Sequence, residues 1–396
     1  MSVDPAVTRR RPSTRVSLGT IAREWTRLGC IGFGGPPTHI ALLRRLCVED
    51  RDWIDSKEFE DGIAATNLLP GPASTQLAIF CAWRLRGAVG AIIGGLCFII
   101  PGLALIIALS TVFLARHPPD WVLGAAAGAG AAVPAVAVNA ASGLIPASWK
   151  RVAHEHAQQV RWVIYAFVGG ASAASVGAYL VLVLIVCGVI EILIRKQGPP
   201  VSQSSARAII PVLAVHTGMI GGLGALAWVA FKVGALSYGG GFVIVPLMQH
   251  DAVVTYHWMS SAQFLNAVAL SQVTPGPVVQ TVAVVGYAAR GVGGALFAAA
   301  IVFAPSFLFI LLGGPRFDQI RANTVIQSFL AGAGPAVIGA IAGSAIPLGL
   351  ALQHGWQIPV LAGATLWLFV IRRGVVSGLL AAGGTGVALA LAGVSV

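Results

Sequence analysis

Long apolar runs, separated by short polar segments, make up most of this chain. A helix needs about 20 mainly apolar residues to cross a lipid bilayer. The runs that meet this requirement are 88–115, 121–146, 162–194, 209–231, 291–314, 326–349 and 375–396. The run 162–194 is long enough for one long helix or two short spans. The pattern therefore predicts an all-α polytopic membrane protein, with the lipid bilayer as its surroundings.

The pattern also repeats along the chain. When the sequence is shifted by 205 positions, aromatic residues, glycines and prolines of one half fall on identical residues of the other. The matched pairs include Gly29 with Gly234, Gly34 with Gly239, Gly35 with Gly240, Trp53 with Trp258, Ser56 with Ser261, Phe59 with Phe264, and Pro70-Gly71-Pro72 with Pro275-Gly276-Pro277. With one residue dropped, Gly87 matches Gly291 and Pro101 matches Pro305. Low-complexity composition does not explain such matches at one offset, so we interpret the chain as two homologous repeats.

The repeats divide the chain into four predicted parts. They are a cytosolic basic tail (1–16), a first transmembrane repeat (17–194), a polar linker (195–208) and a second transmembrane repeat (209–396). Each repeat opens with two apolar segments that glycine and proline interrupt. The interruptions are Phe33-Gly34-Gly35-Pro36-Pro37 and Leu69-Pro70-Gly71-Pro72 in the first repeat, and Tyr238-Gly239-Gly240-Gly241 and Thr274-Pro275-Gly276-Pro277 in the second.

The charges of the loops predict how the repeats are oriented. Loops 43–61 and 147–161 are basic, whereas the matching loops 249–262 and 350–358 carry no Lys or Arg. Because basic loops stay in the cytosol, equivalent loops face opposite sides, which is the pattern of inverted-topology repeats. Arg84 and Arg86 also place both ends of the second interrupted segment in the cytosol. We therefore expect Gly/Pro-broken helices that form re-entrant hairpins, with ordinary spans carrying local kinks as the alternative.

Composition supports a membrane protein and argues against nucleic-acid binding. Only 10% of the residues are charged, against about 25% in a soluble protein. The 25 Lys and Arg residues exceed the 14 acidic residues, but they lie in short loops, as the positive-inside rule expects. No apolar run with a cleavage site follows the polar N-terminus, so we predict no signal peptide and a cytoplasmic N-terminus. The five cysteines show no paired spacing and are expected to be reduced core residues.

The Pro-Gly-Pro motifs are the strongest candidates for chemistry. Proline stops a helix, and the freed backbone N–H and C=O groups cost several kcal/mol each in hydrocarbon unless something satisfies them. Proline is also favoured in the first turn of a helix, so new helices are expected near Pro72 and Pro277. The N-terminus of a helix carries partial positive charge and can bind an anion. The alternative is that these residues only kink packed helices, but equivalent breaks in both repeats favour a site.

Neutral polar side chains next to the breaks complete the predicted substrate site. Amides and hydroxyls can bind an anion without leaving a bare charge in the membrane. The candidate substrate-binding residues are Gly34, Gly35, Asn67, Pro70, Gly71, Pro72, Ser74, Thr75, Gln76, Lys232, Gly239, Gly240, Gln272, Thr274, Pro275, Gly276, Pro277, Gln280 and Thr281.

Charged residues within apolar runs are the second group of candidates. Arg27 and Lys232 match in the two repeats and would suit a dianion, with snorkelling to the interface as the alternative. Arg86 and Arg290, which also match, are expected to anchor helix ends at the interface. The candidates for proton coupling are Glu24, His39, Asp61 and Glu191, although a single histidine is more often a packing residue. The loop His154-Glu155-His156 could hold a metal, but a solvated polar loop is the simpler interpretation, and we predict no metal site.

Several energy sources and chemistries leave no trace in the sequence. There is no Gly-x-x-x-x-Gly-Lys-Ser/Thr loop for ATP, and neither a His-Glu-x-x-His nor a Gly-x-Ser-x-Gly motif. A transporter driven by an ion gradient or the membrane potential, with no cofactor, is therefore favoured over a membrane enzyme or scaffold.

The motifs resemble those of the chromate ion transporter family, of the long two-domain type. The resemblance rests on Gly32-Phe33-Gly34-Gly35-Pro36, Trp53, Leu69-Pro70-Gly71-Pro72 with Ser74-Thr75-Gln76, Phe231-Lys232-Val233-Gly234, Tyr238-Gly239-Gly240-Gly241, Val273-Thr274-Pro275-Gly276-Pro277 and Gly286-Tyr287, and it covers nearly the whole chain. One departure is Ala73, at a position where the family pattern often has a donor Asn.

The resemblance implies a function. It implies a secondary active transporter, and not an enzyme, that exports chromate across the bacterial inner membrane and gives chromate resistance, as an antiporter or by a potential-driven process. Sulfate, a tetrahedral dianion of similar size, is the expected competitor, and sulfate or another oxyanion is the alternative substrate. A homodimer is one assembly compatible with the sequence.

Overall fold

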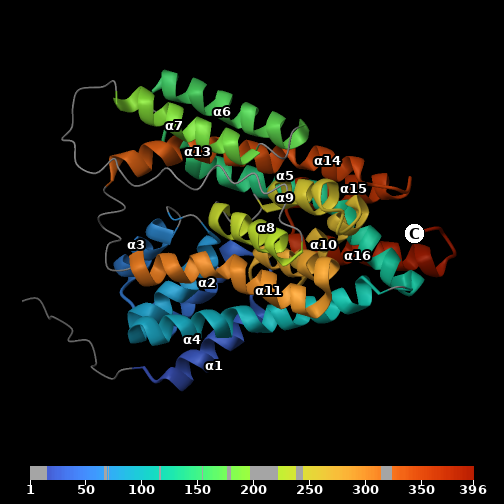
Figure 1. Cartoon of the computed structure of the whole chain (residues 1–396), viewed down its shortest axis with the longest axis horizontal. Helices are drawn as coiled ribbons and strands as arrows, with labels where there is room; N and C mark the ends of the chain where they lie inside the picture. The colour runs from blue at the N-terminus through green and yellow to red at the C-terminus, as the bar shows by residue number, and fades with distance from the viewer. Residues whose placement is uncertain are drawn as a thin grey trace, which may run out of the picture.

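The protein is built from helices packed side by side (Figure 1). The computed structural model describes residues 16–66, 69, 71–115, 117–153, 155–175, 180–196, 222–237, 244–313 and 323–396, and these contain no β-strand. Within these ranges, four helical stretches are long and apolar enough to cross a membrane: Ala73–Phe113, Asp120–Trp149, Val278–Gly313 and Thr324–Leu350. The prediction of an all-helical chain with several long apolar helices is confirmed.

The two repeats contain matching series of elements. The first repeat comprises α1 (Leu18–Ile31), α2 (Pro36–Arg44), a π-helical turn (Arg45–Asp50), α3 (Ser56–Thr66), α4 (Ala73–Phe113), α5 (Asp120–Trp149), α6 (His156–Ser175) and α7 (Leu180–Lys196). The second comprises α8 (Leu223–Leu236), α9 (Ile244–Gln249), a π-helical turn (His250–Thr255), α10 (Ser261–Val273), a 3₁₀ turn (Val278–Gln280), α11 (Thr281–Gly313), α13 (Thr324–Gly343), α14 (Ala345–Leu350), α15 (Gln357–Thr365), a π-helical turn (Leu366–Val370) and α16 (Val375–Leu391). The run 162–194 is thus divided between two helices, α6 and α7. Most of the predicted linker 195–208 lies outside the described residues.

Local backbone geometry repeats along with the sequence. The π-helical turns Arg45–Asp50 and His250–Thr255 occupy equivalent positions and lead to Asp52 (φ 50°) and His257 (φ 51°). The next residues, Trp53 and Trp258, each donate a backbone hydrogen bond back to the π-helical turn that precedes them. Because unusual angles recur at matched residues, the two halves share one local fold as well as one sequence pattern.

Helices α4 and α11 each reverse direction at an arginine–glycine pair. Gly87 has φ 59° and ψ −149°, and its match Gly291 has φ 62° and ψ −156°. As a result, a Cβ added to Gly95 would lie 2.8 Å from a side-chain carbon of Ile79. In a straight helix residues this far apart in sequence would be separated by about 24 Å. Each of these helices is therefore a short helix that follows the Pro-Gly-Pro motif and folds back on a long apolar helix.

The carboxy-terminal parts of the repeats are exchanged. Helix α5 of the first repeat packs mainly on α16, and to a smaller extent on α10, α13 and α15, of the second, whereas α13 packs mainly on α6 and α7 of the first (Figure 1). Small residues allow these helices to approach closely: Gly170 lies against Gly339, and Gly383 lies against Ala125. Small residues drive such helix packing in membranes, where no hydrophobic force acts between helices. Neither repeat would bury these faces without the other.

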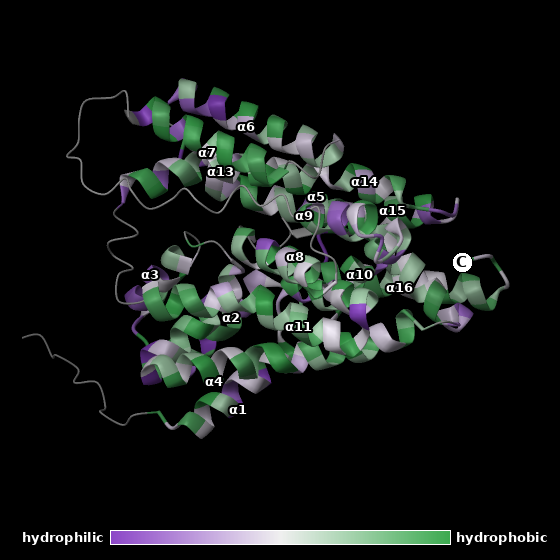
Figure 2. Cartoon of the chain, viewed as in Figure 1, coloured by the Kyte–Doolittle hydropathy of each residue, from purple (hydrophilic) through white to green (hydrophobic). Residues whose placement is uncertain are grey.

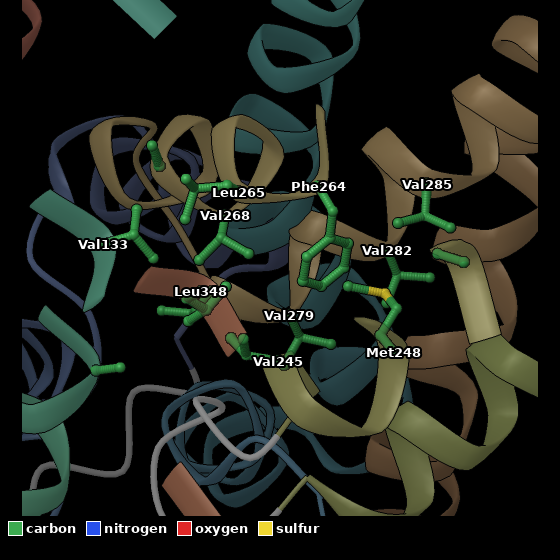
Figure 3. Packing of buried hydrophobic residues seen from close by; sticks show 14 of the residues in the cluster. Val133, Val245, Met248, Phe264, Leu265, Val268, Val279, Val282, Val285 and Leu348 are labelled. Carbon is green, nitrogen blue, oxygen red and sulfur yellow. The ribbon is translucent and has the colours of Figure 1, made fainter. Parts of the chain in front are cut away.

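A large apolar core surrounds the second Pro-Gly-Pro motif. Figure 3 shows Phe264 of α10 and Met248 of α9 against Val279 and Val282, which follow the motif. These side chains come from separate segments of one repeat, so their packing fixes the path of the chain on both sides of the break. The interior around the motif is rigid for this reason.

The outer faces of the long helices are apolar as well. Large side chains that no other part of the described chain covers include Ile92, Leu96 and Ile100 on α4, and Leu296, Leu308 and Leu312 on α11. Hydropathy colouring shows apolar residues along most of these helices, with polar residues gathered toward the ends of the bundle (Figure 2). Contiguous apolar surface of this extent suits lipid and is rare on a soluble monomer.

One glycine contact supplies a test of the fold. In α8, a Cβ on Gly234 would overlap the backbone of Val302, and in the matching place a Cβ on Gly29 would lie 2.6 Å from the Phe98 carbonyl oxygen. We expect Gly234→Ala to push α8 from α11 and destabilise the protein by about 1–3 kcal/mol. The control is Gly293→Ala, because a Cβ there meets no atom within 4 Å. Melting temperatures in detergent measure the difference, and equal values for both variants would contradict this packing.

Candidate functional site

The two Pro-Gly-Pro motifs lie where the repeats meet. The backbone N–H of Gly71 donates to the carbonyl of Ser237, 2.8 Å away, and the N–H of Gly276 donates to the carbonyl of Gly32, 2.9 Å away. Gly71 matches Gly276 and Gly32 matches Ser237, so these are the same hydrogen bond made twice, each time between repeats. Gly71 (φ 120°) and Gly276 (φ 100°) hold angles that other residues rarely adopt.

A new helix begins directly after each motif, as predicted. The backbone amides of Thr75 and Gln76 both donate to the carbonyl of Pro72, at 3.0 Å each. The backbone amide of Gln280 donates to the carbonyl of Pro277 at 2.9 Å. The amides that come before these in each first turn have no acceptor within the helix and carry partial positive charge. Two such helix starts, buried and near one another, can hold negative charge.

Most of the predicted polar residues are buried around these starts. The buried ones are Ser74, Thr75, Gln76, Gln272, Thr274, Gln280 and Thr281. Thr274 and Thr281 donate to carbonyls of their own helical turns, and the Nε2 of Gln280 donates to the carbonyl of Ile99 in the other repeat. Three buried atoms here have no partner among the described residues: Thr75 Oγ1, Gln272 Nε2 and Gln280 Oε1. Unsatisfied polar atoms in a buried place are costly. A bound oxyanion would accept from the Thr75 hydroxyl and the Gln272 amide, which are donors, whereas Gln280 Oε1 can only accept a hydrogen bond.

His39 links the first break to both motifs. The imidazole is buried, its Nε2 lies 2.9 Å from the Gly32 carbonyl, and its Nδ1 lies 3.2 Å from the Ser74 hydroxyl. Because the Gly32 carbonyl also accepts from Gly276, a continuous chain of hydrogen bonds joins Ser74, His39 and Gly276. A neutral His39 that donates through Nε2 would accept the Ser74 proton at Nδ1. The ring also meets the edge of Phe98, so packing fixes its orientation.

The matched basic residues Arg27 and Lys232 do not reach the motifs. Lys232 forms an ion pair with Asp251, and their side chains are only 12% and 14% exposed. The side chain of Arg27 is 60% exposed and lies 3.5 Å from Glu24. Arg27 is therefore placed as the snorkelling alternative expects, and Lys232 is already neutralised.

Two of the other charged candidates, Glu24 and Glu191, are paired with arginines. Glu24 is buried and lies 3.2 Å from both Arg23 and Arg51. Glu191 accepts hydrogen bonds from Arg161, Arg195 and Tyr165, which clamps α6 to α7. Asp61 lies half-buried on α3. Arg86 donates to the Val16 carbonyl at the start of the first repeat, consistent with anchoring of a helix end.

Some predicted residues cannot be placed. Asn67, Pro70, Gly239, Gly240 and His154 lie outside the described residues. Gly34 and Gly35 have φ 94° and 77° and form the first break, directly before α2. The described part of the chain holds no group of three metal-ligating side chains, and its five cysteines are free.

One groove lies elsewhere, between α15 and α16. Its volume is about 480 Å³, and its walls include Trp356, Val360, Trp367 and Leu389. These side chains are almost wholly apolar and bear no charge, so the groove does not suit an oxyanion. The buried motifs remain the candidate site.

A model described as chromate transporter matches residues 19–192 and again residues 224–389. The chain belongs to the chromate transporter family. The double match gives each repeat one copy of the family's domain, and it confirms the resemblance seen in the motifs. Family membership makes this chain a multi-pass membrane transporter and not an enzyme.

Curated relatives match this chain over most of their own length. The chromate transport protein of Cupriavidus metallidurans is 32% identical over 84% of this chain and 82% of its own. The probable chromate transport protein of Synechococcus elongatus is 30% identical over 85% of this chain and 86% of its own. The chromate transport protein of Pseudomonas aeruginosa is 29% identical over 93% of this chain and 91% of its own. No solved structure matches this transporter significantly.

The pairing of Lys232 with Asp251 predicts how variants of this transporter behave. Removing one partner of a buried ion pair typically costs about 3–5 kcal/mol, whereas replacing both with apolar residues is often neutral. We expect Lys232→Met alone to lose folded protein, and Lys232→Met with Asp251→Leu to recover both folded protein and anion transport. Size-exclusion profiles measure the amount of folded protein, and uptake into vesicles measures anion transport. A well-folded double variant without transport would show that Lys232 serves the anion directly.

Proposed function

We propose that this protein is a secondary transporter that exports chromate from the cytoplasm across the bacterial inner membrane and thereby confers chromate resistance. The observation that carries the proposal is the reciprocal contact of the motifs: Gly71 with Ser237, and Gly276 with Gly32. It places two helix starts and a set of buried amides and hydroxyls at the junction of the repeats. The names of the relatives supply the identity of the anion.

A site made of neutral donors suits the transport of a dianion. A dianion that leaves water must be hydrogen-bonded on all sides, because an unpaired buried charge is very costly. Main-chain amides at helix starts and the second N–H of the Gln280 amide can provide such bonds, and Ser74 can do so when its proton turns from His39 to the anion. They do so without a fixed cation, so the empty transporter holds no bare charge in the membrane.

The two halves would rock against each other around this site, with α5 and α13 each moving together with the helices of the opposite repeat on which they pack. Loop charges favour inverted topology, and the interrupted segments are too short to span. At 1.5 Å per residue, the 11 residues of α3 extend about 16 Å, against about 30 Å of hydrocarbon. We therefore take α3 with the start of α4, and α10 with the start of α11, as re-entrant hairpins. Rocking of one repeat against the other would break and remake the two cross-repeat bonds.

The membrane potential favours export. Moving one charge across 100 mV is worth about 2.3 kcal/mol, and a cytoplasm that is electrically negative expels anions. His39 is the titratable residue in direct contact with the site among those described, and it would couple a proton through Ser74. Sulfate or another tetrahedral oxyanion is the alternative substrate, since chromate and sulfate present the same shape and charge.

Direct measurement of movement tests the function. Inverted membrane vesicles that contain the protein should accumulate labelled chromate, lose this uptake when an uncoupler collapses the gradients, and show competition by sulfate. Vesicles without the protein are the control. Absence of uptake, or uptake of sulfate with no effect of chromate, would contradict chromate export.

Two substitutions test the site. Ser74→Ala and Gln280→Ala remove groups next to the two motifs. A hydrogen bond to a charged group contributes about 1.5–3 kcal/mol, so each should reduce transport efficiency by about tenfold or more. The control is Ser110→Ala, because Ser110 is equally buried but donates to the Ile106 carbonyl in its own helix. Normal uptake by both site variants, at equal amounts of folded protein, would contradict the proposed site.

A further inference from the structure

Buried hydroxyls in this protein usually bond to their own helix. Those that donate to a carbonyl of the preceding turn are Thr66, Ser110, Ser271, Thr274, Thr281, Ser328 and Ser344. Among the described residues, only Thr75, Ser172, Ser237 and Ser306 have a buried hydroxyl oxygen without any partner. Ser172 lies on α6, whereas the other three hydroxyls belong to residues that adjoin a single loop.

That loop is the first Pro-Gly-Pro motif. Thr75 stands in the first turn of the helix that follows the motif, and the carbonyl of Ser237 accepts the hydrogen bond from Gly71. The Ser306 oxygen lies 3.4 Å from the point where a Cβ on Gly71 would sit. The three hydroxyls come from three elements, α4, the end of α8 and α11, and two of those elements belong to the second repeat.

The second Pro-Gly-Pro motif has no such set. Gly32 matches Ser237, and Gly102 matches Ser306, so two of the equivalent positions have no side chain. Gln76 lies close to Gly71, and Gln280 lies close to Gly276, so the two glutamines occupy matching places. When they are aligned on each other, the residue that matches Thr75 is Val279. At Gly102, the Gln280 Oε1 would be 2.7 Å from an added Cβ. The amide of Gln280 therefore lies beside Gly102, where the matching residue of the second repeat, Ser306, has a hydroxymethyl side chain.

We infer that the transported oxyanion binds at the first motif, held by the hydroxyls of Thr75, Ser237 and Ser306 together with the main-chain amides of the helix start. This inference rests on the proposed function and adds to it an asymmetric site, completed by two residues of the second repeat. Three hydroxyls from three directions match the several acceptor oxygens of a tetrahedral anion. They are unpartnered in the structure because their partner is the substrate.

The test compares these hydroxyls with matched ones. Thr75→Val, Ser237→Ala and Ser306→Ala remove one oxygen each with little change of shape, and Ser110→Ala and Ser328→Ala are controls whose hydroxyls are satisfied within a helix. In inverted vesicles, each site variant should raise the apparent KM for chromate by about tenfold, as expected for a hydrogen bond to an ion. The controls should stay within about twofold of the parent protein.

A second measurement separates binding from a structural role. Because an unpartnered buried hydroxyl is destabilising, its removal should leave the melting temperature without anion unchanged or higher. The rise in melting temperature that added chromate or sulfate gives the parent protein should shrink in the site variants. A hydroxyl that merely supported the fold would show the opposite: lower stability without anion and an unchanged response to it.

The outcomes distinguish this inference from the function itself. If the parent protein does not move chromate, the proposed function fails. If the parent protein moves chromate and the three variants keep its KM and its thermal response, the function stands and the hydroxyl site is wrong. An equal rise in KM with Thr281→Val, which removes the hydroxyl in the turn after the second motif, would also overturn the asymmetry.

Discussion

A backbone that is interrupted inside a membrane must satisfy the groups that the interruption frees, and this requirement governs the transporter. Water is absent from the hydrocarbon, so each freed N–H and C=O needs a partner from protein or ligand. Here the amides of Gly71 and Gly276 bond to carbonyls of the opposite repeat. The same contacts that repair each break therefore join the repeats, and they leave the first helix-start amides and several buried hydroxyls beside the breaks without a partner in the described part of the chain. The binding site that we propose and the contact between the repeats would then arise from one constraint.

Repetition explains why the central contact is made twice and yet the site is not symmetric. Matched residues such as Trp53 and Trp258 adopt matched geometry, and α5 and α13 pack on helices of the opposite repeat. Side chains are free to differ on this shared frame. His39 has no titratable counterpart in the second repeat, where Ile244 stands, and Ser306 is matched by Gly102. A repeated scaffold is thus compatible with the asymmetric anion site that we propose.

Much of this was predictable from sequence because proline and glycine act locally. Pro72 and Pro277 mark helix starts by removing a donor and fixing φ, so the breaks and the polar residues after them could be found without a structure. The position of Ser237 and Ser306 beside the first motif could not be predicted in this way. They lie far from the first motif in the chain, and their role comes only from packing of α8 and α11 against it. The charge of Lys232 likewise suggested an anion ligand. The sequence did not reveal that this charge is paired, because its partner Asp251 is 19 positions away.

The central claim is that the oxyanion lies at the Pro-Gly-Pro helix starts between the repeats. A cryo-EM structure of the protein in chromate tests it most directly, since chromium scatters more strongly than the surrounding atoms. The account predicts a density feature within hydrogen-bond distance of the first turn of α4, and close to Ser237 and Ser306. Anion density beside Lys232 and Asp251, or in the groove between α15 and α16, with none at the motifs, would contradict it.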